Sequence, residues 1–97
     1  MKILAMERET ADVKPEQFTR YLKPEARAVW ELYQGGHIRE LYFRQDYTQA
    51  VLIMECPSAE AAGHLLQSLP LVKAGLITFD VIPLIAYSGF SRLFAEN

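Results

Sequence analysis

Two glutamates and a tyrosine on neighbouring apolar segments are the residues of this sequence best suited to acid–base chemistry. Glu40 and Tyr42 lie within the segment 37–44, and Glu55 lies near the end of the segment 49–56. A carboxylate half-buried against apolar side chains has a raised pKa, so it can take and return a proton near neutral pH. The tyrosine hydroxyl can donate a hydrogen bond to a developing enolate. The alternative is that both glutamates form ordinary ion pairs with neighbouring arginines or a partner chain.

Five residues near these groups are candidates for binding a substrate. Arg39 can hold a carboxylate with two parallel hydrogen bonds, or it can cap the preceding helix or pair with Glu31. His37 is either a proton carrier near a cavity mouth or an exposed residue where a strand begins. The apolar wall of the site would be formed by Ile38, Val51 and Ile53.

The remaining composition argues against several other kinds of site. The single Cys56 and two histidines offer no metal-binding pattern, so no metal and no cofactor is expected. Gly35 and Gly36 are a helix stop without the rest of a phosphate-binding fingerprint. The net charge of −2 and the scattered lysines and arginines indicate no nucleic-acid partner. No apolar run approaches the roughly 20 residues that cross a membrane, so we expect a cytoplasmic protein.

Helical periodicity occurs in two stretches. The first runs from about residue 15 to residue 33 and is interrupted by Pro24, which predicts either a kink or a short helix followed by a longer one. Its aromatic residues Phe18, Trp30 and Tyr33 are expected in the core. The second helix, 59–69, follows a capping serine and ends at a proline. Its apolar stripe is Ala62, Leu65, Leu66 and Leu69.

Four segments have the composition of strands, at 2–8, 37–44, 49–56 and 76–85. The short polar link 45–48 predicts an antiparallel hairpin between the middle two. The order is therefore β-α-β-β-α-β, an α+β ferredoxin-like fold with a four-stranded antiparallel sheet and both helices on one face.

The other face of this sheet has no helix to cover it, so we expect a second copy of the chain to pack there. The whole chain, 1–97, is predicted to be a single domain with a core at 1–86. The tail 87–97 is rich in aromatic residues and is expected to cross onto a neighbouring subunit.

The length of the hairpin link also predicts which side chains share a face. If Phe43 pairs with Ala50, then Leu41 faces Leu52, Arg39 faces Met54 and His37 faces Cys56 on the helix side. The uncovered face then carries Ile38, Glu40, Tyr42 and Arg44 opposite Gln49, Val51, Ile53 and Glu55. A second subunit on this face would enclose a cavity lined by Tyr42, Val51 and Ile53, with Glu40 and Glu55 as its acids or bases.

Three segments carry a resemblance to a known family. They are WELYQGGHIRELY at 30–42, LPLV at 69–72 and FDVIPL at 79–84. They resemble the muconolactone Δ-isomerase family in a helix that ends in Glu-Leu-x-x-x-Gly, a strand with Arg-x-Leu, a Leu-Pro-Leu element and a closing strand. The sequence departs from the family at Glu40 and Ile38, where those enzymes carry a histidine or an aromatic residue, and in its added aromatic tail.

The resemblance implies a dimeric α/β barrel, in which two sheets pack face to face, sometimes within a ring of dimers. It also implies a cofactor-free isomerase of aromatic catabolism that moves a proton between two carbons of a small unsaturated lactone or carboxylic acid. The alternatives are a dimeric barrel that binds a small organic molecule without catalysis, and a cofactor-free oxygenase of a small aromatic compound.

Overall fold

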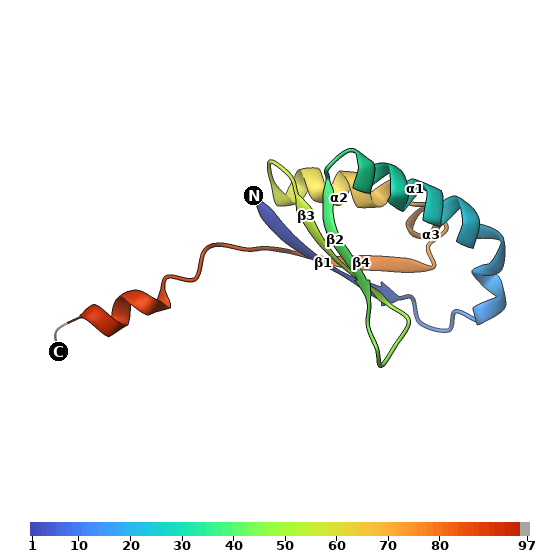
Figure 1. Ribbon diagram of the computed structural model, residues 1–97. Coiled ribbons are helices and arrows are strands. Elements are labelled where there is room, and N and C mark those ends of the chain that lie inside the picture. The colour runs from blue at the N-terminus through green and yellow to red at the C-terminus, as the bar shows by residue number, and fades with distance from the viewer. Residues whose placement is uncertain (96–97) are drawn as a thin grey trace.

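A four-stranded antiparallel sheet with all its α-helices on one face is the framework of the protein (Figure 1). The computed structural model describes residues 1–95. Its strands are β1 (Lys2–Glu9), β2 (Ile38–Phe43), β3 (Ala50–Glu55) and β4 (Ile77–Pro83), in the spatial order β2-β3-β1-β4. Its helices are α1 (Leu22–Gln34), α2 (Ala59–Gln67) and the short α3 (Pro70–Lys73). The predicted ferredoxin-like α+β fold is therefore confirmed.

The first helical stretch is split. Two 3₁₀ turns, Pro15–Gln17 and Thr19–Tyr21, precede α1. Pro24 is the third residue of α1, in the first helical turn, where backbone N–H groups have no partner within the helix. The proline therefore costs no hydrogen bond there. At the other end, Gly36 has a φ of 82°, a left-handed conformation that ends the helix with little strain.

The second helical stretch has the predicted capping residue. The Ser58 Oγ accepts a hydrogen bond from the Ala61 N–H at 3.0 Å, which satisfies one free donor at the start of α2. Pro70 ends this stretch as predicted, and it also begins the single turn of α3. The chain then enters β4, which pairs with β1 from Ile3 to Glu9.

The core lies between the sheet and α2. Along β1, Ile3 and Ala5 are fully buried, whereas the alternate residues Leu4 and Met6 are only partly buried. This alternation shows that one face of the sheet is covered and the other is open. The buried set from all elements is Ile3, Ala5, Ile38, Leu52, Met54, Cys56, Ala62, Leu66 and Leu69.

The β2–β3 hairpin has the predicted register at its closed end and a β-bulge at its open end. Phe43 pairs with Ala50 and Leu41 with Leu52, but Ile38 rather than Arg39 pairs with Met54. The extra residue in β2 turns Ile38 into the core, where it is 1% exposed.

Two predictions for this end of the hairpin are therefore wrong: that Ile38 lies on the uncovered face, and that Arg39 faces Met54. The predicted pairing of His37 with Cys56 is wrong as well, because the His37 carbonyl accepts its hydrogen bond from the Glu55 N–H. The bulge buries an apolar side chain in place of a charged one, which explains why it is favoured.

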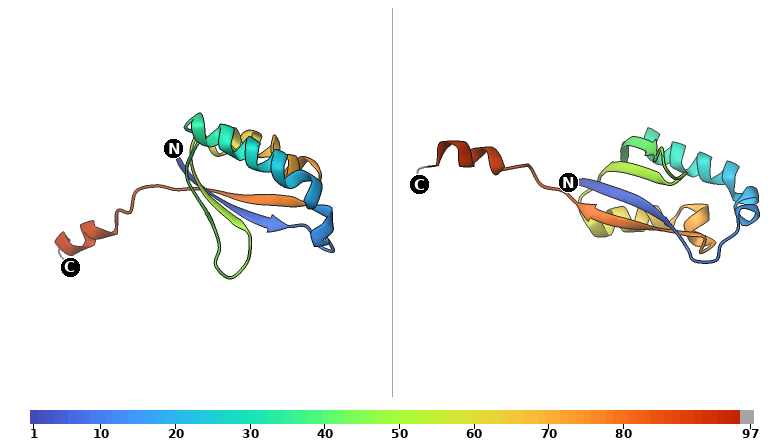
Figure 2. Two further views of the ribbon diagram at one scale, coloured as in Figure 1. Left: turned by 45° about the vertical axis from the view of Figure 1, so that its right-hand side comes forward. Right: turned by 90° about the horizontal axis from the view of Figure 1, so that it is seen from below.

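The C-terminal tail extends away from the body of the protein in all views (Figures 1 and 2). It contains a 3₁₀ helix, Gly89–Phe94. Residues 96–97 of the predicted tail lie outside the described part of the chain. Within residues 1–95, no helix has the length and apolar character to cross a membrane.

Candidate functional site

A large hollow opens between α1 and the helix-facing side of the sheet, with a volume of about 1110 Å³. Its floor is formed by strand residues that point toward the helices: Leu41, Phe43, Ala50, Leu52 and Phe79. Its opposite wall is formed by α1 and the turns before it: Val13, Phe18, Leu22, Ala26, Val29, Trp30 and Tyr33. The sequence placed the cavity on the opposite face of the sheet.

The hollow exists because the aromatic side of α1 does not reach the core. No residue of α1 is fully buried, and Trp30 and Tyr33 are 55% and 45% exposed. Their rings lie 5.9 Å apart at the mouth of the hollow. The prediction that Trp30 and Tyr33 are core residues is therefore wrong. Phe18, by contrast, is partly buried and packs against the cluster of Leu71 and Ile77.

Glu7 brings a carboxylate into the hollow from the inner strand β1. It follows Ile3 and Ala5 along the helix-facing side, and its Oε1 accepts a hydrogen bond from the Ala50 N–H at 3.0 Å. Burial raises the pKa of Glu7 above its ordinary value, and the Ala50 hydrogen bond opposes that rise. The negative charges of Glu9 and Glu25 raise the pKa further.

Glu25 brings a second carboxylate from α1. Its Oε1 accepts a hydrogen bond from the Leu71 N–H at 2.9 Å, so it connects α1 to the first turn of α3. Burial raises the pKa of Glu25, and the Leu71 hydrogen bond partly offsets this. The charge of Glu25 is also the smallest of the causes that raise the pKa of Glu7.

Arg39 lies at the open edge of the hollow, on the bulge of β2. Its Nε donates a hydrogen bond to the carbonyl of Gly36 at 2.7 Å, so it caps the end of α1, one of the alternatives left open by the sequence. The rest of the guanidinium group still has donors for a ligand. Among the described residues that line the hollow, Arg39 is the one cation beside four carboxylates, those of Glu7, Glu9, Glu25 and Glu40.

Glu40 and Tyr42 also lie on this edge strand and contact each other, and they pair with Ile53 and Val51 on the uncovered face, as predicted. The Tyr42 hydroxyl donates a hydrogen bond to the Glu40 Oε1 at 2.8 Å, and this bond raises the pKa of Tyr42. Both side chains are exposed. Within residues 1–95, Arg44 pairs with Asp46 and forms no ion pair with either predicted glutamate.

The other predicted site residues lie elsewhere. The Glu55 carboxylate accepts a hydrogen bond from the N-terminal ammonium of Met1 at 2.5 Å, which lowers the pKa of Glu55. Val51 and Ile53 are half-buried on the uncovered face, opposite Tyr42 and Glu40. His37 is exposed at the turn before β2 and does not line the hollow.

Sequence reasoning missed Glu7 and Glu25, although a signal for each was present. Glu7 continues the alternation Ile3, Ala5 on the side of β1 that faces the core. Glu25 lies three residues after Leu22 and four before Val29, on the apolar stripe of α1. A carboxylate in a row of apolar residues is costly to bury, so it often has a functional role.

The described residues 1–95 contain no group of three or more His, Cys, Asp or Glu side chains placed to hold a metal ion. The donors that line the hollow are carboxylates on separate elements, a guanidinium group and hydroxyls. Such groups are suited to proton transfer and to hydrogen bonding with an oxygen-containing ligand.

Solved structures that share this fold include the two that follow. The structure of a muconolactone isomerase aligns with a TM-score of 0.72 and 21% identity, over 91% of this chain and 92% of that one. The 5-chloro-2-hydroxyhydroquinone dehydrochlorinase of Burkholderia phenoliruptrix AC1100, in complex with 2,5-dihydroxybenzoquinone, aligns with a TM-score of 0.65 and 19% identity. That alignment covers 92% of this chain and 98% of the dehydrochlorinase.

Sequence comparisons differ in their outcome. Comparison with curated protein sequences gave no significant match. The sequence profile of the family described as muconolactone delta-isomerase, however, matches residues 4–89, which is most of the chain. This chain therefore belongs to the muconolactone delta-isomerase family.

Proposed function

We propose that this protein is a cofactor-free enzyme that moves a proton between two carbons of a small unsaturated ring compound. The observation that carries the proposal is the pair Glu7 and Glu25 in an apolar hollow. Each carboxyl is half-buried, each is held by one backbone N–H, and each has a raised pKa. Proton shifts need groups of this kind, whose pKa lies nearer the working pH than that of an exposed carboxylate.

The two carboxyl groups differ in a way that suggests separate roles. Burial raises the pKa of both carboxyl groups, and the negative charges of Glu9 and Glu25 act in addition on Glu7. In the proposed step the Glu25 carboxylate takes a proton from one carbon, and the electron pair moves through the conjugated system. The Glu7 carboxylic acid then gives its proton to the second carbon. Proton exchange from Glu25 to Glu7, directly or through water, restores the starting state.

Residues at the open edge would orient the substrate. Arg39 is already fixed through its Nε, so its remaining N–H groups can bind a carboxylate or enolate oxygen without further ordering. A substrate held there would place its ring against Trp30 and Tyr33.

Solvent exchange of deuterium tests the proposal. Muconolactone incubated in deuterated water with the wild-type protein should gain deuterium faster than in buffer. Glu7→Gln and Glu25→Gln should each slow this exchange by roughly 100-fold or more, the usual contribution of a general acid or base. Glu31→Gln, on the exposed side of the same helix, is the matched control and should exchange at the wild-type rate.

Glu40→Gln separates this site from the one inferred from sequence. If Glu40→Gln abolishes exchange while Glu7→Gln and Glu25→Gln do not, the proton carrier lies at the edge of β2, and the pair proposed above is wrong. If the wild-type protein exchanges no deuterium into the lactone, muconolactone is not its substrate.

A second candidate function is the loss of hydrogen chloride from a chlorinated, hydroxylated ring. The aromatic lining by Phe18, Trp30, Tyr33 and Phe79 favours it, because it suits a planar ring, and so does the excess of carboxylates over cations. The relative that forms a complex with 2,5-dihydroxybenzoquinone shares the fold. In this reaction one ring hydroxyl would lose its proton to a carboxylate while the chlorine-bearing carbon takes a proton from a carboxylic acid. A second hydroxyl would then lose its proton as the carbon–chlorine bond breaks and chloride leaves. Chloride release from 5-chloro-2-hydroxyhydroquinone, compared between wild type and Glu25→Gln, would distinguish the two functions.

A further inference from the structure

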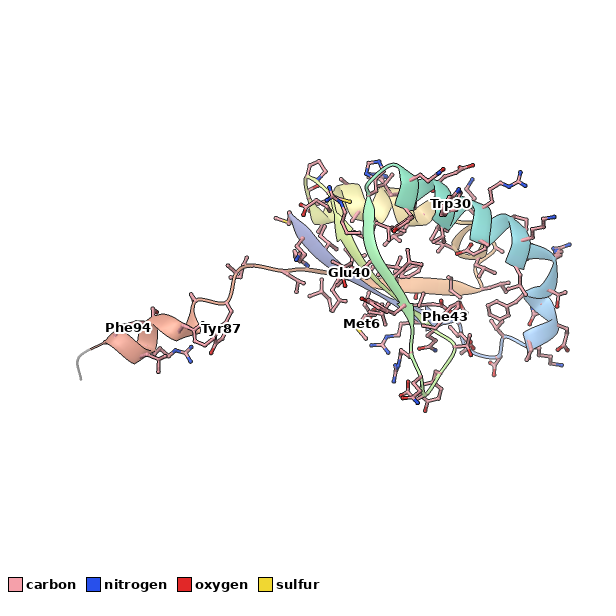
Figure 3. The ribbon with its side chains drawn as sticks, in the orientation of Figure 1. Met6, Trp30, Glu40, Phe43, Tyr87 and Phe94 are labelled. Carbon is pink, nitrogen blue, oxygen red and sulfur yellow. The ribbon has the colours of Figure 1, made fainter. Side chains whose placement is uncertain are left out.

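The hollow is elongated, because it follows nearly the whole of α1. The residues of α1 that line it recur from Leu22, the first residue of the helix, to Tyr33, the next-to-last. Figure 3 shows Trp30 on α1 and Phe43 on β2, two of the elements that border the hollow. Its volume of about 1110 Å³ exceeds the range of about 300–1,000 Å³ that is typical of pockets for drug-sized organic ligands. A single small ring therefore fills only part of the hollow.

The charged groups of the hollow are separated along its length. Arg39, the one cation that lines it within residues 1–95, lies beyond the C-terminal end of α1, where its Nε donates a hydrogen bond to the Gly36 carbonyl. Glu25 lies in the first turn of the same helix. From Glu25 to Gln34, the last residue of α1, the helix rises by about 14 Å. The Glu25 carboxylate and the guanidinium group therefore lie toward opposite ends of the hollow.

The sheet gives a second, independent measure of this separation. Glu7 accepts a hydrogen bond from the Ala50 N–H, and Ala50 pairs with Phe43, so Glu7 is level with Phe43 and two strands away from it. Arg39 precedes Phe43 by four positions along β2. Two inter-strand spacings and this length of strand place the Cα atoms of Glu7 and Arg39 roughly 15 Å apart. The hydrogen bond to Gly36, in the turn before β2, holds the guanidinium group away from Glu7.

The lining between the two ends is apolar. It consists of Ala26 and Val29 from α1 and Leu41 and Leu52 from the floor. A slot with a cation at one end, carboxyl groups at the other and apolar walls between them is complementary to a long ligand with an acidic group at one end only. A single-ring acid whose carboxylate is bound by the guanidinium group is too short to place its ring carbons against the two carboxyl groups.

We propose that the substrate of this site is an elongated, unsaturated carboxylic acid with two joined rings. Its carboxylate binds Arg39, and its first ring packs against Trp30 and Tyr33. Its second, conjugated ring reaches Glu7 and Glu25, where a ring hydroxyl can donate a hydrogen bond to one of the carboxylates. This inference rests on the proposed function, because it takes Glu7 and Glu25 as the groups that move the proton.

Unreactive acids of increasing length test the inference by isothermal titration calorimetry, which measures binding without catalysis. The probes are benzoate, biphenyl-4-carboxylate and 4′-hydroxybiphenyl-4-carboxylate. The Kd of biphenyl-4-carboxylate should be at least about ten-fold lower than that of benzoate, and the added hydroxyl should lower it several-fold further. Arg39→Gln should raise the Kd of biphenyl-4-carboxylate by roughly ten-fold, because it removes hydrogen bonds to a charged group. The same variant should leave the Kd of the neutral biphenyl-4-methanol unchanged.

Ala26→Phe tests where the second ring lies. Ala26 is exposed within the hollow, beside Glu25 and one helical turn before Trp30, so an added ring there blocks the way to the carboxyl groups without entering the core. This variant should weaken the binding of both biphenyl acids by at least about ten-fold and leave benzoate unchanged. Gln67→Phe adds the same side chain on the exposed side of α2, outside the hollow, and is the matched control. It should bind all three probes as the wild type does.

Three results would overturn the inference. They are equal Kd values for benzoate and biphenyl-4-carboxylate, an Arg39→Gln variant that binds the biphenyl acid as tightly as the wild type, and an Ala26→Phe variant that still binds the longer acids. Deuterium exchange into muconolactone that is slowed by both Glu7→Gln and Glu25→Gln would support the proposed function even then. Because the probes report binding and the exchange assay reports proton transfer, the two proposals can fail separately.

Discussion

At the scale of single residues, the site depends on two carboxyl groups placed where apolar side chains would stabilise the fold better. Glu7 and Glu25 lie in rows of core-facing residues, and each has a single backbone N–H as its hydrogen-bond partner among the described residues. One neutral hydrogen bond does not offset the loss of hydration of a charged carboxylate. A stability penalty of this kind is common at functional sites.

Replacing Glu7 by glutamine should stabilise the protein at neutral pH. The pKa of Glu7 is raised in the folded protein, so the folded state binds its proton more tightly, and this group lowers stability as pH rises above its unfolded pKa of about 4.3. Glutamine keeps the oxygen that accepts from Ala50 but carries no charge. The melting temperature of Glu7→Gln should exceed that of the wild type at pH 7 by a few degrees, since roughly 1 kcal/mol shifts a domain of this size by about 4–8 °C.

The difference should shrink as the pH falls below about 4.3, because Glu7 is then protonated in both states. Glu31→Gln should change the melting temperature little at either pH. A Glu7→Gln variant that melts below the wild type at pH 7 would contradict the burial of this carboxylate. The same substitution should lower the proposed activity, so its effects on stability and on activity have opposite signs.

At the scale of elements, the turn between α1 and β2 sets the geometry of the open edge. Gly36 ends the helix in a left-handed conformation, and its carbonyl accepts the hydrogen bond from Arg39. The bulge that follows turns Ile38 into the core and leaves Arg39 outward. The glycine-containing turn and the extra residue of β2 thus hold the guanidinium group of Arg39 at the open edge of the hollow.

Two glycine substitutions should have opposite effects on stability. Gly36→Ala places a Cβ on a residue with a φ of 82° and should destabilise the protein by about 1–2 kcal/mol. Gly63→Ala lies inside α2 with no atom within 4 Å of the added Cβ, and it should stabilise by about 0.5–1 kcal/mol. Urea unfolding of both variants measures the difference. A neutral Gly36→Ala would mean that the turn relaxes to another conformation.

At the scale of the whole molecule, the open face of the sheet is a surface left without a cover. Its partly exposed apolar residues are Leu4, Met6, Val51, Ile53 and Ile82. Met6 lies near the middle, between Val51 and Asp80 on the neighbouring strands, and Figure 3 shows it on the side of the sheet away from the helices. We propose that a second copy packs its own sheet on this face to form a homodimer.

A charge at the centre of this face should break the homodimer. Met6→Glu would bury an unpaired carboxylate between two sheets, so it should convert a dimer into monomers in analytical ultracentrifugation. Gln67→Glu adds the same charge on the exposed side of α2 and should leave the dimer intact. A wild-type protein that sediments as a monomer at high concentration would disprove packing through this face.

The local pattern of the sequence was sufficient for the strands, the two helical stretches and the hairpin. Apolar periodicity, proline and glycine positions and a short polar link are properties of neighbouring residues, so they can be read without knowledge of distant contacts. The pairing of Phe43 with Ala50 follows from the length of the hairpin link in the same way. The family was visible in the spacing of three short motifs and is confirmed by the match over residues 4–89.

Only the tertiary structure decided which of the chemically capable residues share a site. Glu7 and Glu25 are 18 positions apart in the sequence, and both line the hollow because β1 contributes to its floor and α1 to its opposite wall. Arg39 lies at the edge of the same hollow because the β-bulge at the start of β2 exchanges the faces on which the side chains of Ile38 and Arg39 were expected. The simple alternation of strand residues does not predict such a bulge. Glu40, the first predicted acid or base, lies on the edge strand β2, and Glu55, the second, lies on the face of the sheet away from the hollow. The hollow lies on the other face, where the aromatic side of α1 stands away from the sheet.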